Sequence, residues 1–450
     1  MSGGKKSLPG TSLVVVGPRG CGKTTALANI ASLLGGFREQ ALEEVSSLAK
    51  EFGRPDARNA WMLDRLVTER ERGLTIESSL VGFRSEAFSY TAVDTPGDPA
   101  LSRNMMGVLS MSDVAALVVS AAAGEYEESV ESGRIREAAL ACFTMGIKNI
   151  VVWVTKMDDL SVGFAAARFE EIKKAVIGFI KEVGYKQKDV PVVPISGSGG
   201  DNLVAKSPNM EWYTGKPAVE SLDEIGPINR PAEKPLRLPV LKVHDAGESG
   251  TVIVGRVETG TVRVGIKLVF SPGGFVGEVT SIQMDGAKVS EAKGGDIVGV
   301  ALSGVSSEDI KRGMVASLTT NDPAATAETF LAQVVVFDHP GTIRSGYCPA
   351  ITVHTAQIPC EFEELVAKID RKTGKEEAGR PDGARTGEVV TVRVRPLQPV
   401  CVETFSAYPS LGRFAIRDHG RTVGVGVIKE VTKRPVPKPR SKGENEYFES

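Results

Sequence analysis

The chain contains 450 residues, of which 41% are hydrophobic and 24% charged, and its formal net charge is −2 at pH 7. This length exceeds one ordinary hydrophobic core, so we expect a globular protein of about two to four domains. The near-neutral charge excludes a protein that binds nucleic acid through its overall charge; any such binding requires a local basic patch.

The cysteine content and the apolar segments predict a cytoplasmic protein without a membrane partner. The five cysteines include no C-x-x-C pair, which favours a reduced intracellular setting. The first residues, M-S-G-G-K-K-S-L-P-G, have no apolar core and do not resemble a signal peptide. The longest apolar stretches, such as 114–123, are too short to span a bilayer.

The first half of the chain alternates apolar runs with helical patterns, which is typical of a doubly wound α/β domain. The pattern predicts buried strands at 13–16, 90–93, 114–122, 150–154 and 190–195. It predicts helices between them at 24–34, 134–145 and 164–183. In such a sheet the ligand lies at the carboxyl ends of the strands.

The second half has short β-branched runs between glycines, as at 250–255 and 295–299, and predicts two β-barrels. A helical period is visible only at 361–370. We therefore predict an α/β domain at 1–230 and two barrels at 236–322 and 328–434. Residues 435–450 are rich in Pro and Lys/Arg, and we predict that they form a disordered tail.

The segment Gly17–Thr24 reads G-P-R-G-C-G-K-T and lies between a predicted strand and a predicted helix. This is the setting of a phosphate-binding loop, whose backbone N–H groups and helix N-terminus favour phosphate. Lys23 is expected to reach the β- and γ-phosphates and Thr24 to ligate Mg²⁺. The predicted phosphate-end residues are Gly17, Gly20, Cys21, Gly22, Lys23, Thr24 and Thr25.

A second motif, Asp94-Thr-Pro-Gly97, follows the strand predicted at 90–93. An acidic residue at a strand end can hold Mg²⁺ through water, and the N–H of Gly97 can donate to the γ-phosphate. D-x-x-G is common in surface turns, but next to a phosphate-binding loop it indicates a nucleoside triphosphate site.

Two further motifs follow the next strands and favour guanine over adenine. Asp158, in Thr155-Lys-Met-Asp158, can accept hydrogen bonds from guanine N1 and N2, while Lys156 can lie over the base. The backbone of Ser196-Gly197-Ser198 can donate to guanine O6. Each motif alone is also typical of a surface turn, but their order and their placement at strand ends predict a site for GTP or GDP with Mg²⁺.

With these motifs the chain resembles the translational GTPases, in particular the elongation factor 1-alpha family, over roughly residues 12–434. Other segments similar to that family are 60–64, 69–76, 255–260, 339–341 and 411–418. The resemblance implies a GTP-binding domain followed by two β-barrels, and it implies Thr75 as a second Mg²⁺ ligand. It also implies delivery of aminoacyl-tRNA to the ribosome and a nucleotide-exchange factor as a partner.

The chain departs from the family next to the predicted γ-phosphate. The family has a histidine after D-x-P-G that positions the attacking water, whereas this chain has Asp98, and its four histidines all follow residue 243. Asp98-Pro99 suits a helix N-cap followed by a first-turn proline. The alternative is that Asp98 orients water as a carboxylate, which like-charge repulsion from the γ-phosphate opposes.

Three other positions differ from the family pattern. Arg19 and Gly20 stand where the family has an aliphatic residue and an aspartate. Arg19 can stabilise the γ-phosphate in cis, point to solvent, or pair with Asp98. Thr155 replaces an asparagine, which predicts a guanine selectivity weakened by about 1 kcal/mol, the value of one hydrogen bond.

These observations favour a carrier of aminoacyl-tRNA that binds Mg²⁺·GTP normally and hydrolyses it slowly, because losing a water-orienting group costs about 10²–10⁴ in rate. One alternative is a hydrolysis-impaired paralogue that serves as a scaffold on the cytoskeleton or in a large assembly. Another is a GTPase of ribosome rescue or termination.

Overall fold

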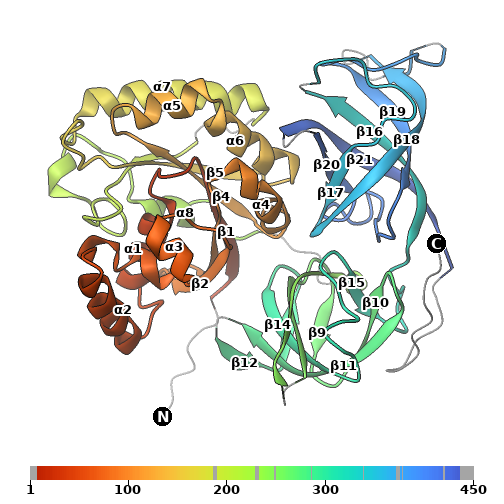
Figure 1. Cartoon of the computed structure of the whole chain (residues 1–450), viewed down its shortest axis with the longest axis horizontal. Helices are drawn as coiled ribbons and strands as arrows, with labels where there is room; N and C mark the ends of the chain where they lie inside the picture. The colour runs from red at the N-terminus through yellow and green to blue at the C-terminus, as the bar shows by residue number, and fades with distance from the viewer. Residues whose placement is uncertain are drawn as a thin grey trace. The chain divides into compact units, whose positions relative to one another are not determined.

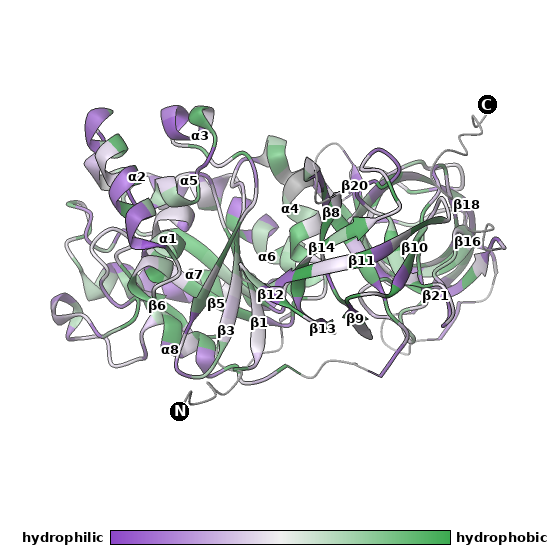
Figure 2. Cartoon of the chain, turned by 90° about the horizontal axis from the view of Figure 1, so that it is seen from below, coloured by the Kyte–Doolittle hydropathy of each residue, from purple (hydrophilic) through white to green (hydrophobic). Residues whose placement is uncertain are grey.

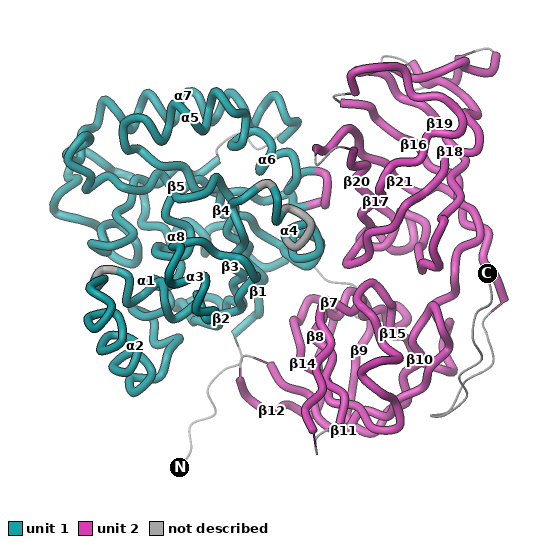
Figure 3. The backbone as a smooth tube through the Cα atoms, in the orientation of Figure 1, with its two compact units in different colours: residues 1–143, 147–229 teal, residues 144–146, 230–450 magenta. Residues whose placement is uncertain are grey.

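The computed structural model describes residues 8–185, 190–228, 233–247, 250–284, 286–337, 339–370, 375–377, 379–418 and 421–435. The chain divides into two compact units, one of residues 1–143 and 147–229 and one of residues 144–146 and 230–450 (Figures 1 and 3). Among the described residues, no helix has the length and apolar character needed to cross a membrane.

A six-stranded sheet forms the centre of the first unit, in the order β2-β3-β1-β4-β5-β6. Its strands are β1 (Gly10–Val16), β2 (Ser79–Arg84), β3 (Ser89–Asp94), β4 (Val114–Ser120), β5 (Asn149–Thr155) and β6 (Val192–Pro194). The five predicted strands are confirmed, and they pair in parallel. The sequence pattern did not predict the edge strand β2, which pairs antiparallel with β3.

Helices and short 3₁₀ turns connect these strands. The α-helices are α1 (Lys23–Leu33), α2 (Glu39–Glu51), α3 (Val67–Arg72), α4 (Ser102–Leu109), α5 (Glu125–Glu131), α6 (Arg134–Thr144), α7 (Ala166–Val183) and α8 (Ala218–Asp223). The 3₁₀ turns are η1 (Pro55–Ala57), η2 (Ala60–Met62), η3 (Pro99–Leu101) and η4 (Pro208–Met210). In Figure 2 the hydrophobic colour follows the central strands, whereas α2 is mostly hydrophilic and buries only Ala49.

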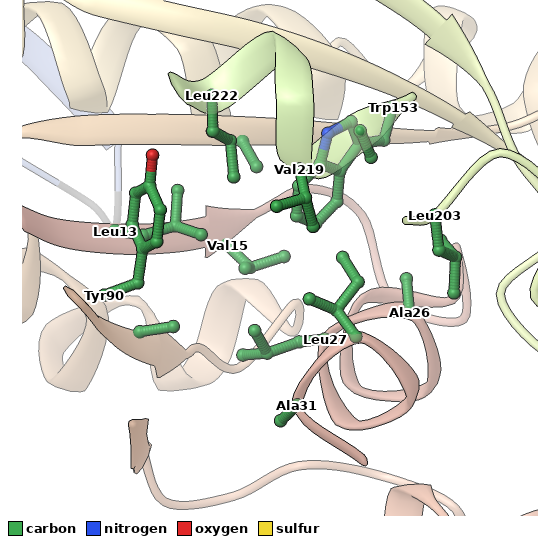
Figure 4. Packing of buried hydrophobic residues seen from close by; sticks show 14 of the residues in the cluster. Leu13, Val15, Ala26, Leu27, Ala31, Tyr90, Trp153, Leu203, Val219 and Leu222 are labelled. Carbon is green, nitrogen blue, oxygen red and sulfur yellow. The ribbon is translucent and has the colours of Figure 1, made fainter. Parts of the chain in front are cut away.

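Helices α1 and α8 each bury an apolar face against the sheet. For α1, which follows the phosphate-binding loop, this contact fixes the position of its first turn. Leu27 of α1 and Val219 of α8 pack with Val15 and Trp153, the last two from β1 and β5 (Figure 4). Each fully buried aliphatic side chain of this kind contributes about 1.5–3 kcal/mol relative to exposure. The packed layer therefore holds the carboxyl ends of β1 and β5 beside the N-terminus of α1.

The second unit contains two closed antiparallel barrels of six strands each. The first closes in the order β10-β15-β7-β8-β14-β11, because β10 also pairs with β11. Its strands are β7 (Leu238–Asp245), β8 (Thr251–Arg256), β10 (Lys267–Ser271), β11 (Phe275–Met284), β14 (Ile297–Ser303) and β15 (Val315–Leu318). The short strand β12 (Ala287–Val289) extends β11, and β9 (Thr261–Arg263) pairs with β13 (Glu291–Lys293).

The second barrel closes in the order β16-β19-β18-β17-β20-β21. Its strands are β16 (Ala327–Val336), β17 (Ala350–Val353), β18 (Ala356–Ile369), β19 (Val389–Pro396), β20 (Arg413–Asp418) and β21 (Arg421–Lys433). The predicted fold, an α/β GTPase-type domain followed by two barrels, is confirmed. The predicted domain boundaries stay a proposal, and the predicted tail lies outside the described residues from 436 onward.

The helical interpretation of residues 361–370 is wrong, because residues 361–369 belong to strand β18. The ladder between β18 and β19 shifts register between Phe362 and Glu364 and again between Leu365 and Ala367. Each bulge adds a residue to the strand. The buried residues Phe362 and Leu365 therefore lie three residues apart, which imitates helical spacing in the sequence.

A buried polar network joins the two barrels. The Arg237 side chain, which is fully buried, donates from Nη2 to Asp322 Oδ2 at 2.7 Å and to Glu403 Oε1 at 2.9 Å. Its guanidinium lies 4.6 Å from the centre of the Tyr408 ring. Lys433 Nζ donates to the second oxygen of Glu403 at 2.6 Å. Because Arg237 precedes β7 and Glu403 follows β19, this network connects one barrel to the other.

Candidate functional site

The loop between β1 and α1 has the backbone of a phosphate-binding loop. Gly17 has φ of 149°, and a Cβ there would lie 2.3 Å from Val118 O, so only glycine fits. Lys23, 5% exposed, donates from Nζ to Gly17 O at 3.1 Å and to Pro18 O at 2.7 Å. The ammonium group therefore lies over the loop, where phosphate oxygens would compete for it.

A cavity of about 660 Å³ opens beside this loop and brings together most of the predicted site residues. A nucleotide-sized ligand fits a cavity of this volume, since ligand pockets span roughly 300–1,000 Å³. The predicted residues that line it are Arg19, Gly20, Gly22, Lys23, Thr24, Thr25, Thr75, Gly97, Thr155, Lys156, Asp158, Gly197 and Ser198. Gly17, Cys21, Asp94, Asp98 and Ser196 lie outside the lining set.

The three predicted Mg²⁺-site residues lie in direct contact. Thr24 Oγ1 donates to Asp94 Oδ2 at 2.7 Å, and its distance to Thr75 Oγ1 is 2.9 Å. Thr75 Oγ1 also donates to Asp64 Oδ1 at 3.2 Å. The cluster thus contains a second carboxylate, Asp64, that the sequence analysis did not assign, although it ends the family-like segment 60–64.

The donor set of this cluster fits a magnesium ion. Asp94 is fully buried, and its Oδ1 makes no hydrogen bond within the described part of the chain. Burial raises the pKa of Asp94 to about 6 and, together with the nearby Asp94 charge, the pKa of Asp64 to about 7. Hydroxyl and carboxylate oxygens are the protein ligands Mg²⁺ takes, alongside phosphate oxygens and water. A bound cation would stabilise both carboxylates in the charged form.

Glu69 closes the loop that presents Thr75 to this cluster. The Glu69 side chain, 2% exposed, accepts hydrogen bonds from the N–H groups of Leu66, Ile76 and Glu77 at 2.9, 2.9 and 3.0 Å. A buried carboxylate with three N–H donors fixes the backbone on both sides of Thr75. Glu69 is the first residue of the segment 69–76 that resembles the family. This resemblance is the sequence feature that could have identified Glu69 as a site residue.

Asp98 makes the contact expected of a helix cap. Its Oδ1 accepts a hydrogen bond of 2.9 Å from the N–H of Ala100, and its carbonyl accepts one from Leu101 at 3.0 Å. These bonds begin the 3₁₀ turn η3. One carboxylate oxygen of Asp98 is therefore engaged with the backbone.

Arg19 and Gly20 form the exposed rim of the phosphate-binding loop. The Arg19 side chain is exposed, and within the described part of the chain it makes no hydrogen bond and no ion pair with Asp98 or another residue. Cys21, 2% exposed, packs below the rim, and burial raises the pKa of its thiol.

Gly97 lies against the phosphate-binding loop, and its replacement gives a direct test. A Cβ at this position would approach Lys23 Nζ to 2.4 Å and Arg19 N to 2.8 Å. We expect Gly97→Ala to lower GTP affinity about tenfold or more relative to GDP affinity, because shifted backbone withdraws a γ-phosphate donor worth about 1.5–3 kcal/mol. Equilibrium titration with both nucleotides measures this. Equal losses for GTP and GDP would contradict it.

The base end of the cavity is built from the loops after β5 and β6. Thr155 Oγ1 donates to Cys21 O at 2.6 Å and lies 3.2 Å from Val119 O, so its hydroxyl ties β5 to the phosphate-binding loop. Lys156 has φ of 58°, and its Nζ donates to both carboxylate oxygens of Glu125 at 2.7 Å. Glu125 was not expected from the sequence; it holds the lysine that is predicted to lie over the base.

Asp158 and the loop after β6 meet directly. Ser198 Oγ donates to Asp158 Oδ2 at 3.0 Å, and Ser196 Oγ accepts from Gly199 N–H at 2.8 Å. Asn29 of α1 donates from Nδ2 to Gly197 O at 2.9 Å. Asn29 was missed, because its contact needs the β6 loop to lie over α1, and no local pattern indicates that.

Family models match three parts of the chain in order. Residues 9–242 match the elongation factor Tu GTP binding domain, 250–317 match elongation factor Tu domain 2, and 329–429 match the GTP-eEF1A C-terminal domain-like model. Elongation factor 1-alpha of Tetrahymena pyriformis is 43% identical over 424 residues, which cover 94% of this chain and 98% of that protein. The chain belongs to the elongation factor 1-alpha family of translational GTPases.

Another member agrees with this assignment, and two solved structures share the fold. Elongation factor 1-alpha of Entamoeba histolytica is 43% identical over 425 residues, covering 94% of this chain and 96% of that protein. The GTPase-like domain of S. cerevisiae Ski7 superposes with a TM-score of 0.76 at 15% identity, covering 94% and 97% of the two chains. Elongation factor SelB of Methanococcus maripaludis gives 0.69 at 20% identity, covering 95% and 81%. The family binds guanine nucleotides, so this chain is a GTP-binding protein of the elongation-factor class.

Proposed function

We propose that this chain binds GTP and GDP with Mg²⁺ in the cavity beside the phosphate-binding loop. Lys23 and the N–H groups from Gly17 to Thr25 hold the phosphates, and Thr24 and Thr75 ligate Mg²⁺. Asp94 holds the ion through water, which suits its unpaired Oδ1. Asp158 accepts from guanine N1 and N2, Lys156 covers the base, and Ser196–Ser198 donate from their backbone to O6.

With GTP bound, the chain delivers aminoacyl-tRNA to the ribosome. The support is similarity to elongation factor 1-alpha through both barrels and not only through the nucleotide domain. A nucleotide-exchange factor then restores the GTP form, and the protein works in the cytoplasm. The purified protein loaded with GTP is expected to protect the aminoacyl ester of charged tRNA from hydrolysis. Absence of protection at low salt, where contacts to the tRNA phosphates are strongest, would contradict the proposed delivery of aminoacyl-tRNA.

Intrinsic GTP hydrolysis is slow. The observation that carries this proposal is the hydrogen bond from Ala100 N–H to Asp98 Oδ1, because it engages the side chain at the water-orienting position in a backbone cap. A carboxylate near the γ-phosphate also meets like-charge repulsion. Single-turnover hydrolysis without ribosomes, compared between the wild type and Asp98→His, tests this proposal; a wild-type rate that Asp98→His does not increase would overturn it.

The same observation favours a second candidate, a paralogue that holds GTP as a structural ligand within a cytoskeletal or other large assembly. Arg19 is exposed at the cavity rim with no partner among the described residues, so it can lie over a γ-phosphate and stabilise its charge. This candidate predicts GTP that copurifies with the protein and stays intact. Ribosome-stimulated turnover of about 1–100 s⁻¹ would exclude it.

A further inference from the structure

The base end of the site contains a contact between a hydroxyl and a carboxylate to which the proposed function gives no role. The Ser198 hydroxyl donates to Asp158 Oδ2 at 3.0 Å. Asp158 follows β5 and Ser198 follows β6, so the bond joins the two loops that line the base end of the cavity. The motif 196–198 predicts only backbone donors, which leaves the side chain of Ser198 unassigned.

The backbone that carries Ser198 is held from two sides. Asn29, 7% exposed, donates from Nδ2 to Gly197 O at 2.9 Å and to Ser198 O at 3.4 Å. Gly197 packs on the first turn of α1, where a Cβ would approach Ala26 N to 3.3 Å. Behind it, Ser196 Oγ accepts from Gly199 N–H. The Ser198 hydroxyl therefore starts from a fixed backbone position when it reaches Asp158.

Guanine recognition depends on how the Asp158 carboxylate is oriented. Guanine N1–H and N2–H are parallel donors, so both carboxylate oxygens must face the base edge in its plane. Asp158 is exposed, and ordering an exposed side chain on binding costs free energy. A charge-assisted hydrogen bond to Oδ2 uses one lone pair of that oxygen. It leaves the other lone pair and Oδ1 available to the base, while it restricts rotation of the group.

We propose that Ser198 is a positioning residue for guanine selectivity. Its hydroxyl fixes the Asp158 carboxylate in the orientation that accepts from guanine N1–H and N2–H. Asn29 supports it by fixing the loop. The inference rests on the proposed function, in which Asp158 recognises guanine.

Equilibrium binding of GDP and IDP in the presence of Mg²⁺ tests this role. IDP lacks the 2-amino group of guanine, so it makes one hydrogen bond fewer to Asp158. We expect Ser198→Ala to lower GDP affinity about three- to tenfold and IDP affinity by less, since one hydrogen bond contributes a factor of this order. Ser198→Thr keeps a hydroxyl and is expected to retain wild-type selectivity. Equal losses for the two nucleotides, or no loss for either, would overturn the proposal.

A double-variant comparison separates positioning from loop stability. In an Asp158→Ala background, Ser198→Ala is expected to change GDP affinity no further, because the positioned carboxylate is absent. A second loss of the original size would show that Ser198 acts through the loop instead. Ser161→Ala is the matched control, since the Ser161 hydroxyl donates to the neighbouring Asp159 Oδ1 at 2.6 Å, and it should leave GDP affinity unchanged.

Different results would contradict the proposed nucleotide site and the proposed role of Ser198. If the wild-type protein does not bind GDP, the proposed nucleotide site is wrong, and this inference falls with it. If the wild type binds GDP and prefers it to IDP while Ser198→Ala keeps the same preference, only the role of Ser198 is wrong.

Discussion

Asp98→His is expected to raise the rate of GTP hydrolysis by about 10²–10⁴, the usual contribution of a group that positions and activates the attacking water. The carboxylate of Asp98 accepts from Ala100 N–H, and Asp98 directly follows Gly97, whose N–H is predicted to donate to the γ-phosphate. A neutral imidazole removes the repulsion and offers both a donor and an acceptor to water. Single-turnover release of phosphate, with and without ribosomes, measures the change.

Asp98→Asn is the matched control for that experiment. Asparagine keeps the cap, because its side-chain oxygen also accepts from an N–H at the start of a helix, but it has no charge and cannot act as a base. We expect hydrolysis within about tenfold of wild type, since neither side chain is an efficient general base here. A large fall in Asp98→Asn would show that Asp98 orients the water as a carboxylate. Fast wild-type turnover that Asp98→His does not increase would refute the argument from Asp98.

Local patterns predicted the nucleotide site because each motif follows a buried strand. Thr24, Asp94 and Asp158 are placed by β1, β3 and β5, and the carboxyl ends of neighbouring parallel strands meet at one edge of the sheet. The contact between Thr24 and Asp94 therefore follows from the sheet order alone. The position of Thr75 came instead from the family resemblance, since no strand precedes it directly.

Other contacts were not predictable, because they depend on how loops lie in space. Asn29 and Gly197 are separated by 168 residues and meet only because the loop after β6 packs on α1. Glu69 looks like one of several charged residues on a short exposed helix, and its burial becomes evident only when the N–H groups of Leu66 and Ile76 point at it. In β18, two bulges remove the alternation that identifies a strand.

The network around Arg237 concerns stability and not catalysis. The Arg237 side chain is fully buried and the Glu403 side chain is 7% exposed, whereas that of Asp322 is 53% exposed. Removal of the arginine leaves the Glu403 carboxylate buried and paired with Lys433. A buried charge that loses a partner destabilises a protein far more than an exposed one does, because water cannot replace the lost hydrogen bonds.

We expect Arg237→Ala to lower the free energy of unfolding of the second unit by about 3–5 kcal/mol. Arg263→Ala is the matched control in the same barrel, because Arg263 pairs with Glu291 at 2.9 Å on the exposed surface, and its effect should be much smaller. The three tryptophans, Trp61, Trp153 and Trp212, all lie in the first unit, so their fluorescence reports that unit, while circular dichroism adds the barrels. Urea titration followed by both signals separates the unfolding transitions of the two units. Equal destabilisation by Arg237→Ala and Arg263→Ala would show that the buried network does not hold the barrels together.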